Sequence, residues 1–311
     1  MKDTLLEAPR PREARGDAWI AKLRSRRRVV GSIAILLASL AWAVEPVLVK
    51  LALRDADYLE TSMVRAGFIA LVGCLYALLT RRLDLRISRR ELSAVCYLAL
   101  AGTLLGDLLY IYALTRTPVI NAVLIGHMQP IFILLFGLVL WKGDALTRQD
   151  LLGMAIMLLA GVLVTSRTLS NLAQFRLGTL GDLHVLLATI AWATTAMVAR
   201  KYLAEQNAGL ITFYRFLIAF VALSLWLLAS GSWRIENAYQ IALGLLVGVG
   251  CILYYEGLKR LPAAVVGSLE LSTPVFSALL GFVVLGEIVT GLQMAGILLL
   301  GVGIYFLSRN S

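Results

Sequence analysis

Charged residues are scarce in this chain of 311 residues. Only 15% of the residues are Asp, Glu, Lys or Arg, whereas 59% are hydrophobic. Soluble domains usually carry about 25% charged residues. The polar stretches between the apolar ones are also too short to form a soluble domain. These deficits exclude a soluble protein and predict an integral membrane protein with one membrane domain, residues 29–308.

Cysteine, histidine and the common enzyme motifs are also nearly absent. Cys74, Cys96 and Cys251 have no CxxC spacing and fall in apolar segments, so we expect small apolar fillers rather than disulfides or metal ligands. The two histidines, His127 and His184, have no carboxylate at a co-ligand spacing, so we expect no metal and no cofactor. His-Glu-x-x-His, Gly-x-Ser-x-Gly and Walker-type motifs do not occur, which disfavours an enzyme and ATP-driven transport.

The apolar residues fall into ten segments, each close to the ~20 residues that a helix needs to cross the hydrocarbon core. None of them alternates with the two-residue period of an outer-membrane barrel strand. We therefore predict an all-α membrane protein with ten transmembrane helices. The expected helices span residues 29–53, 59–80, 92–115, 118–141, 149–167, 181–199, 208–230, 237–258, 262–285 and 289–308.

The chain contains an internal repeat. Trp42, Lys50 and Arg65 recur 150 positions later as Trp192, Arg200 and Arg215, and Tyr110 and Pro130 recur 144 positions later as Tyr254 and Pro274. Each copy contains five apolar segments. Because five is odd, the second copy must enter the membrane from the opposite side. We predict two inverted five-helix repeats, residues 29–167 and 168–311, an arrangement of secondary transporters whose substrate sites lie near the bilayer midplane.

Basic residues are distributed unequally between the two sides that these helices define. With the N-terminus inside, 21 of the 29 Lys and Arg lie on the cytoplasmic side and five lie in external loops. This positive-inside bias predicts that both termini are cytoplasmic. We expect residues 1–28 to form a flexible basic tail that touches anionic lipid headgroups of the bilayer. A nucleic-acid partner is not expected despite the net charge of +10, because no aromatic-interleaved basic fold accompanies it.

The first expected helix carries an acidic residue at its middle, Glu45, which is followed directly by Pro46. Ionisable residues within a membrane span usually face a partner or a water-filled cavity. Proline also removes a backbone donor and breaks the hydrogen-bond ladder. We expect Glu45 to bind a proton, a cation or a substrate ammonium, and it is our coupling candidate. The alternative is a carboxylate that is protonated or neutralised by Lys50.

The ninth expected helix carries a polar stripe. Glu270, Thr273 and Ser277 lie on one face together with Pro274. A carboxylate, hydroxyls and a broken backbone ladder suit a substrate path, so we predict that these residues line a cavity. The alternative is that the hydroxyls hold helices together.

The third and fourth expected helices add four candidates. Asp107 and Tyr110 share one face of residues 92–115, where Asp107 either lines the cavity or pairs with a neighbouring helix. His127 and Gln129 directly precede Pro130 and join the predicted cavity. A lone histidine in a helix is more often a packing residue than a proton relay, so His127 keeps both interpretations.

Two repeat-related pairs of residues indicate tasks that both halves share. For Arg65 and Arg215 we favour a structural task, such as pairing with a carboxylate, over substrate binding. Trp42 and Trp192 could flank one cavity from two sides, with help from Tyr110 and Tyr254, because aromatic faces bind apolar substrates well. The alternative for the aromatic residues is ordinary packing.

Glycines are frequent in the fifth and tenth expected helices, Gly153, Gly161, Gly296 and Gly301 among them. Small residues permit close contact between helices in a membrane. We therefore expect a packing surface or a homodimer interface there, rather than a substrate path.

Taken together, the motifs resemble the drug/metabolite transporter superfamily, and within it the EamA-type exporters. They are the tryptophan of helices 1 and 6, the arginine of helices 2 and 7, Pro-x-Phe in helices 4 and 9, and an acidic residue followed by Thr and Gly before helices 5 and 10. The last motif is Asp144, Thr147 and Gly153 in the first half, and Glu287, Thr290 and Gly296 in the second.

The resemblance implies a ten-helix bundle whose central cavity is lined by helices 1, 3, 4, 6, 8 and 9. It also implies export of amino acids or related small metabolites, hydrophobic and aromatic amino acids among them, across the bacterial inner membrane. Glu45 departs from the family, whose members usually have a small or amide residue there. That departure keeps an alternative open, the proton-coupled efflux of cationic, drug-like compounds.

Overall fold

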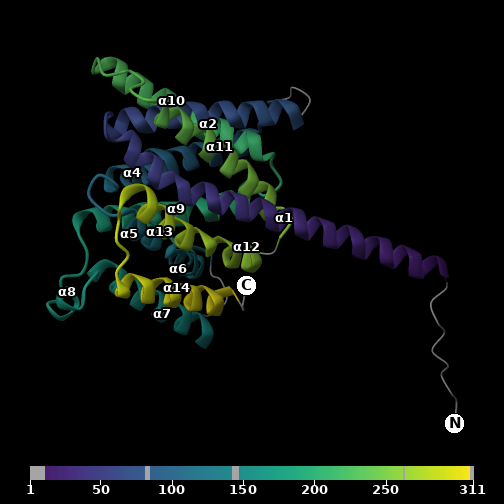
Figure 1. The fold of residues 1–311 in the computed structure, drawn as a ribbon. Helices are drawn as coiled ribbons and strands as arrows, with labels where there is room; N and C mark the ends of the chain where they lie inside the picture. Colours follow the sequence, from purple (N-terminus) through teal and green to yellow (C-terminus); the bar gives the residue numbers. More distant parts are fainter. Residues whose placement is uncertain (1–10, 81–84, 142–146, 262, 309–311) are drawn as a thin grey trace, which may run out of the picture.

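The described residues of the computed structural model, 11–80, 85–141, 147–261 and 263–308, form a helical bundle without strands (Figure 1). Among these described residues, eight helical segments are long and apolar enough to cross a membrane, and Ser272–Leu285 and Gly291–Leu307 are shorter apolar helices. The chain is therefore an all-α membrane protein. Residues 1–10 of the predicted tail and Asp144 lie outside the described residues.

The helices follow the apolar segments closely. Those of the first half are α1 (Pro11–Ala52), α2 (Tyr58–Thr80), α3 (Arg89–Tyr97), the π-helix η1 (Leu98–Asp107), α4 (Leu108–Ala113), α5 (Val119–Gly126), α6 (Gln129–Trp141) and α7 (Arg148–Ser166). They are followed by α8 (Leu169–Ala173), α9 (Leu180–Tyr202), α10 (Ala208–Ala229), α11 (Ala238–Leu258), α12 (Ala263–Glu270), α13 (Ser272–Leu285) and α14 (Gly291–Ser308). Three of the predicted spans are therefore composed of more than one helical piece.

α1 differs from the predicted first helix in two respects, its start and its path through Pro46. Its backbone is helical from Pro11, so the part of the predicted tail that the structure describes continues the first span outward (Figure 1). The helix also runs without interruption through Pro46, where we expected a break. A proline removes one hydrogen bond, that to the carbonyl of Trp42, and the packing of the neighbouring helices keeps the rest of α1 helical.

Contacts between the helices are reciprocal between the two halves. α2 packs against α10 and α7 packs against α14, so each of these pairs joins equivalent helices. α1 packs against α11 and α13, and the equivalent α9 packs against η1 and α6. In Figure 1 the α2–α10 pair lies at one side of the bundle and the α7–α14 pair at the other.

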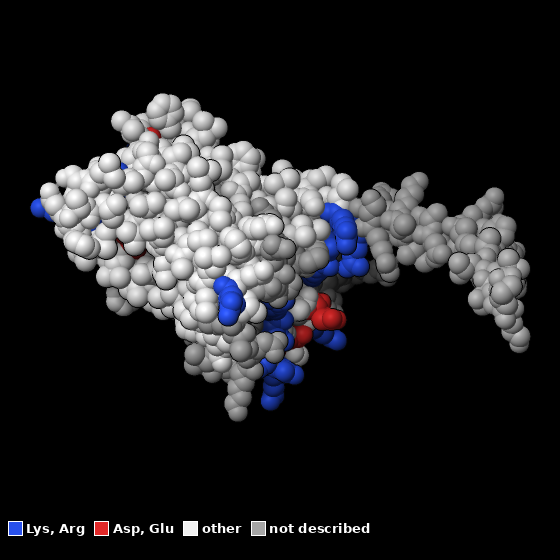
Figure 2. Space-filling model, turned by 90° about the horizontal axis from the view of Figure 1, so that it is seen from below, with Lys and Arg blue, Asp and Glu red and all other residues white. Residues whose placement is uncertain are grey.

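Charged side chains gather at one end of the bundle, near the point where α1 leaves it (Figure 2). We name this the basic end; there Arg27 of α1 lies beside Lys259 and Arg260, and Arg27 Nη2 donates to the Lys259 carbonyl oxygen at 2.9 Å. Most of the remaining surface in that view is uncharged. Elsewhere in the bundle, leucine, valine and aromatic side chains such as Leu225, Trp226 and Leu298 are also exposed. Such a belt suits contact with lipid tails.

Candidate functional site

Arg65, in α2, joins carboxylates from two other helices. Its Nη2 donates to Glu45 Oε1 at 2.6 Å, and its Nη1 donates to Asp107 Oδ2 at 2.9 Å. The three side chains are buried, with 6%, 11% and 7% of their surface exposed for Arg65, Glu45 and Asp107. Buried charges persist only when they are paired and hydrogen-bonded. Arg65 therefore neutralises Glu45, while Lys50, the expected alternative partner, pairs with Glu287 at 2.8 Å.

Asp107 is also held from the second half of the chain. Trp192 Nε1 donates to Asp107 Oδ1 at 2.8 Å, and Arg215 Nη2 lies 3.8 Å from the same oxygen. Arg215 Nε in turn donates to Thr103 Oγ1 at 2.9 Å. The central polar cluster, as we name this group, consists of Glu45, Arg65, Thr103, Asp107, Trp192 and Arg215. It draws on α1, α2, η1, α9 and α10.

The central polar cluster is balanced in charge, with two carboxylates and two guanidinium groups. The ring of Phe216 lies between the guanidinium groups, 5.7 Å from Arg65 Cζ and 4.9 Å from Arg215 Cζ, at distances typical of cation–π contacts. Arg65 Nε is buried and has no hydrogen-bond partner among the described residues. An unused buried donor costs free energy, and a ligand oxygen that accepts its hydrogen would recover that free energy.

The third span has an unusual backbone where it reaches the cluster. The π-helix η1 extends over ten residues and ends at Asp107, and π-helical turns often occur at functional sites. Two glycines let partners approach η1 closely. A Cβ atom at Gly106 would lie 2.7 Å from Trp192 Nε1, and one at Gly102 would lie 2.9 Å from Arg215 Nη2. The sequence analysis missed both glycines, although their spacing of four is typical of close helix contact.

The two halves contribute unequally to the cluster. Both repeat-related arginines reach it. The positions equivalent to Glu45 and Asp107, however, hold Thr195 and Cys251. Both acids therefore come from the first half alone, so the cluster offers a ligand different chemistry on its two sides.

The predicted aromatic residues form two repeat-related pairs. The Tyr110 and Trp192 ring centroids are 5.2 Å apart, and those of Trp42 and Tyr254 are 4.8 Å apart. Both pairs are inclined edge to face or tilted, the geometry that aromatic rings prefer. The first pair is tied to the central polar cluster by the hydrogen bond from Trp192 to Asp107.

The fourth and ninth spans are interrupted at equivalent places, between α5 and α6 and between α12 and α13. Pro130 and Pro274 follow these breaks and cannot donate to the carbonyls four residues earlier, of which Glu270 supplies one. His127 Nδ1 lies 2.7 Å from the Val123 carbonyl oxygen, and its ring lies near the backbone of Glu270. The structure thus brings His127 and Glu270 together at the two breaks. Gln129 begins α6 nearby and is half-buried.

Thr273 and Ser277 are buried against α1. Thr273 Oγ1 donates to the Ser39 carbonyl oxygen at 3.3 Å, and Ser277 Oγ donates to that of Ala43 at 3.4 Å. These bonds hold α13 against α1, as the alternative in the sequence analysis stated. A role for the two hydroxyls in a substrate path stays a prediction.

Metal ligands and thiols add little to this site. Within the ranges that the structure describes, no three His, Cys, Asp or Glu side chains gather closely enough to hold a metal ion. Cys74, Cys96 and Cys251 are free thiols. Cys251 is half-buried and packs, like Trp192, against the apolar core that contains Tyr110.

Comparison with known proteins places the chain among transporters. The EamA-like transporter family matches residues 29–167 and again residues 179–309. An uncharacterized transporter of Methanothermobacter thermautotrophicus is 26% identical over 234 residues, which cover 73% of this chain and 67% of that protein. The Pseudopaline exporter CntI of Pseudomonas aeruginosa is 25% identical over 284 residues, covering 90% of this chain and 96% of the exporter.

One solved crystal structure has the same fold. It superposes with a TM-score of 0.62 at 22% sequence identity and covers 92% of this chain and 98% of its own. The two family matches together span nearly the whole membrane domain. The chain belongs to the EamA-like transporter family.

Proposed function

We propose that this transporter exports amino acids or related small metabolites, preferably hydrophobic or aromatic ones, from the bacterial cytoplasm by alternating access. The observation that carries the proposal is the buried bridge from Glu45 through Arg65 to Asp107. A charged, hydrogen-bonded group at the centre of a membrane bundle is costly to maintain, and such groups mark substrate and ion pathways. Transport, rather than catalysis, is the activity of the family.

The bridge can exchange one ion for another. A substrate carboxylate that reaches Arg65 accepts a hydrogen bond from the free Nε and takes the place of Glu45 on Nη2. Bidentate pairing of this kind is the strongest that a guanidinium makes with a carboxylate. Glu45, once released, binds the substrate ammonium or a proton, so charge in the buried site stays balanced throughout.

The apolar part of the substrate is assigned to the aromatic pairs. Tyr110 and Trp192 lie directly beside Asp107, and Trp42 with Tyr254 forms the repeat-related wall. Rigid aromatic faces suit flat or branched hydrophobic groups. The similarity to a pseudopaline exporter supports a small metabolite as cargo.

For the architecture we propose ten transmembrane helices in two inverted repeats, with both termini in the cytoplasm of the bacterial inner membrane. The reciprocal contacts between equivalent helices support two structurally related halves. The basic end supports a cytoplasmic position for the side from which α1 emerges.

A homodimer through the outer faces of α7 and α14 is part of the proposal. Gly153 and Gly303 already serve the contact between these helices within one chain, so the dimer would use exposed side chains such as Leu152 and Leu298.

Counterflow in proteoliposomes tests the export proposal. Vesicles are loaded with one unlabelled amino acid at a time, and entry of labelled tryptophan or phenylalanine is followed. We expect counterflow with aromatic or branched amino acids, and an Arg65→Lys variant should lose most of it because a single ammonium cannot reproduce two parallel hydrogen bonds. Absence of counterflow with every amino acid would overturn the substrate assignment.

A second function, proton-coupled efflux of cationic compounds, is favoured by the same two acids. Glu45 and Asp107 have no acidic counterpart in the second half, so a cation that displaces Arg65 would find both on one side. In this case lipophilic cations, rather than amino acids, compete for transport. If Glu45 couples transport to protons, Glu45→Gln abolishes the pH dependence of the rate, and an unchanged pH response removes Glu45 from the coupling step.

A further inference from the structure

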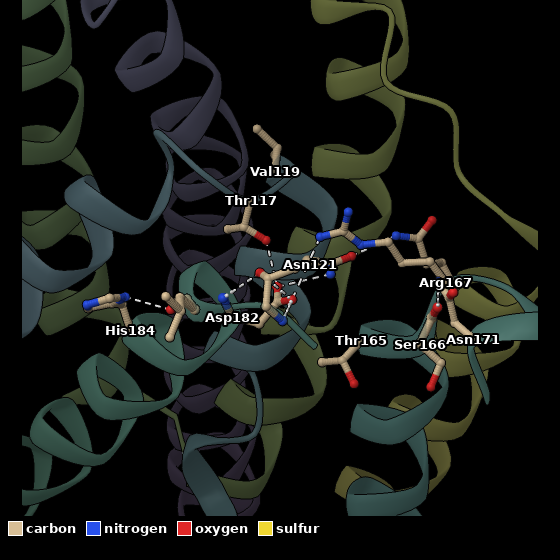
Figure 3. Close-up of polar contacts among 12 residues, drawn as sticks. Thr117, Val119, Asn121, Thr165, Ser166, Arg167, Asn171, Asp182 and His184 are labelled. Atoms are coloured by element: carbon tan, nitrogen blue, oxygen red, sulfur yellow. Dashed lines mark hydrogen bonds and ion pairs between the residues drawn. The ribbon is translucent and has the colours of Figure 1, made fainter. Parts of the chain in front are cut away.

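A second buried polar network includes Thr117, Asn121 and Asp182 (Figure 3). It lies at the end of the bundle where α1 finishes and α5 and α9 begin, opposite the basic end. Asp182 Oδ1 accepts hydrogen bonds from Thr117 Oγ1 at 2.6 Å and from Asn121 Nδ2 at 3.0 Å. Asn121 Oδ1 accepts in turn from Gln293 Nε2 at 2.7 Å. No more than 4% of any of these four residues is exposed. We name this group the latch.

The latch joins the beginnings of three helices. Thr117 precedes α5, Asn121 lies in its first turn, Asp182 lies in the first turn of α9, and Gln293 lies in that of α14. Asp182 Oδ2 caps its own helix by accepting from the Thr179 backbone N–H at 2.8 Å. A helix cap needs only that oxygen. The bonds at Oδ1 therefore serve the contact between helices and are not required by α9 itself.

A strap beside the latch ties the same end to α1. Glu287 accepts from the Val119 backbone N–H at 2.8 Å through Oε2, and its Oε1 pairs with Lys50 Nζ of α1 at 2.8 Å. The carboxylate caps the start of α5, where the helix dipole favours negative charge. Latch and strap together connect α1, α5, α9 and α14 at one end.

The latch has no equivalent at the basic end. Repeat positions equivalent to Thr117, Asn121, Asp182 and Gln293 hold Leu261, Val265, Ser32 and Asp150. Leucine and valine have no side-chain donor or acceptor, so the network cannot form a second time. In an inverted-repeat transporter the two ends open by equivalent motions, and a bond made in only one conformation shifts the equilibrium toward it.

We propose that Thr117, Asn121, Asp182 and Gln293 are gating residues, which hold the end opposite the basic end closed and make the conformation open to the basic end the resting state. This inference rests on the proposed alternating-access function. For an exporter, the latch keeps the site accessible from the cytoplasm until substrate is bound. Because opening must break hydrogen bonds to a buried carboxylate, loss of the latch should raise the population open at that end roughly tenfold or more.

Cys251 provides a reporter, because it occupies the repeat position equivalent to Asp107 and packs against the same apolar core as Trp192. Cys74→Ala and Cys96→Ala leave it as the only thiol of the chain. Thr117→Val and Asn121→Val then remove the latch bonds at similar side-chain size while leaving the Asp182 cap in place, and Asn121→Val copies the residue of the other half. Asn171→Ala is the matched control, since Asn171 lies at the same end but donates only within its own segment, to the Ser166 carbonyl oxygen.

A membrane-impermeant thiol reagent is applied separately to the two faces, in right-side-out and inside-out vesicles. We expect the latch variants to label about tenfold faster from the face opposite the basic end, with no rise from the basic face, while Asn171→Ala behaves as the parent.

Equal acceleration from both faces indicates general loosening and overturns the proposal, as does unchanged labelling. If Cys251 labels in no variant, backbone hydrogen exchange over residues 119–126 decides: faster exchange supports the latch, and unchanged exchange overturns it. Faster labelling from the expected face without any counterflow leaves the latch standing and rejects the proposed substrate.

Discussion

Replacement of Arg65 by methionine tests whether the central polar cluster is held together by charge balance. In Arg65→Met, Glu45 loses the ion pair and hydrogen bond that its carboxylate makes with Arg65, and Asp107 keeps Trp192 and the more distant Arg215. Removal of one member of a buried ion pair costs about 3–5 kcal/mol, because the other charge stays buried. At roughly 2–4 °C per kcal/mol for a large domain, the apparent melting temperature should fall by about 6–20 °C.

A second substitution separates charge balance from packing. Arg65→Met with Glu45→Gln removes one positive and one negative charge, so the remaining pair of Asp107 and Arg215 is again neutral. We expect this double variant to recover at least half of the lost melting temperature, which is a coupling that independent sites would not show. Lys50→Met is the matched control: it breaks an ion pair whose partners are 24% and 16% exposed, so it should lower the melting temperature by less than Arg65→Met does.

The measurement is the loss of the monodisperse peak after heating in detergent, followed by the tryptophan fluorescence of the eluted protein. All variants are heated at one rate, because unfolding of membrane proteins is commonly irreversible and the midpoint then depends on the rate. A shift for Arg65→Met no larger than that for Lys50→Met would refute the charge-balance argument. So would a double variant that is no more stable than Arg65→Met alone.

Two further predictions concern the partners of Asp107. Trp192→Phe keeps an aromatic ring beside Tyr110 but removes the donor to Asp107 and to the Gly102 carbonyl, so counterflow should slow by about tenfold. The control, Trp42→Phe, should slow counterflow by less than about threefold. Similar effects of the two substitutions would contradict a special role for Trp192. Gly106→Ala places a Cβ atom 2.7 Å from Trp192 Nε1 and should destabilise the protein by about 1–3 kcal/mol. The control, Gly137→Ala, meets no atom within 4 Å and should be neutral or slightly stabilising. Equal melting temperatures of the two variants would contradict the close approach of Trp192 to Gly106.

Most helix positions could be predicted from the sequence, because the lengths of apolar runs and the polar residues at their ends determine them. Helices α9 and α11, for example, begin at capping boxes, in which Thr179 pairs with Asp182 and Asn237 pairs with Gln240. What the sequence did not reveal was the internal geometry of a span. The π-helix η1 and the uninterrupted path of α1 through Pro46 depend on contacts with other helices, which local propensity does not contain.

The candidate site was predictable in its residues but not in its pairing. Glu45, Asp107, Trp192 and both arginines were all recognisable as costly or repeated residues within a membrane span. Their partners were not, since a helical period gives the face of a helix but not the helix that packs against it. Lys50 was the nearest base to Glu45 along the chain, whereas the observed partner, Arg65, comes from α2. Arg65 and Arg215 both lie close to Asp107, and the unused Arg65 Nε leaves room for a ligand, so the choice between a structural task and substrate binding stays a prediction.

Comparison of the two halves gives a physical criterion for functional residues that composition alone does not supply. Positions that hold the same residue in both halves, such as Arg65 and Arg215, are explained by a structural role that the two halves share. At other positions a polar residue of one half corresponds to a residue of different chemistry in the other half, as with Asp107 and Cys251 or Asn121 and Val265. A packing role common to both halves cannot explain such a polar residue. The first pair lies at the centre of the bundle, where a ligand distinguishes one side from the other. The second lies at one end, where a bond favours one conformation. Under the proposed alternating-access function, asymmetry of this kind sets the resting state, because a fully symmetric pair of halves would give the two open conformations equal free energy.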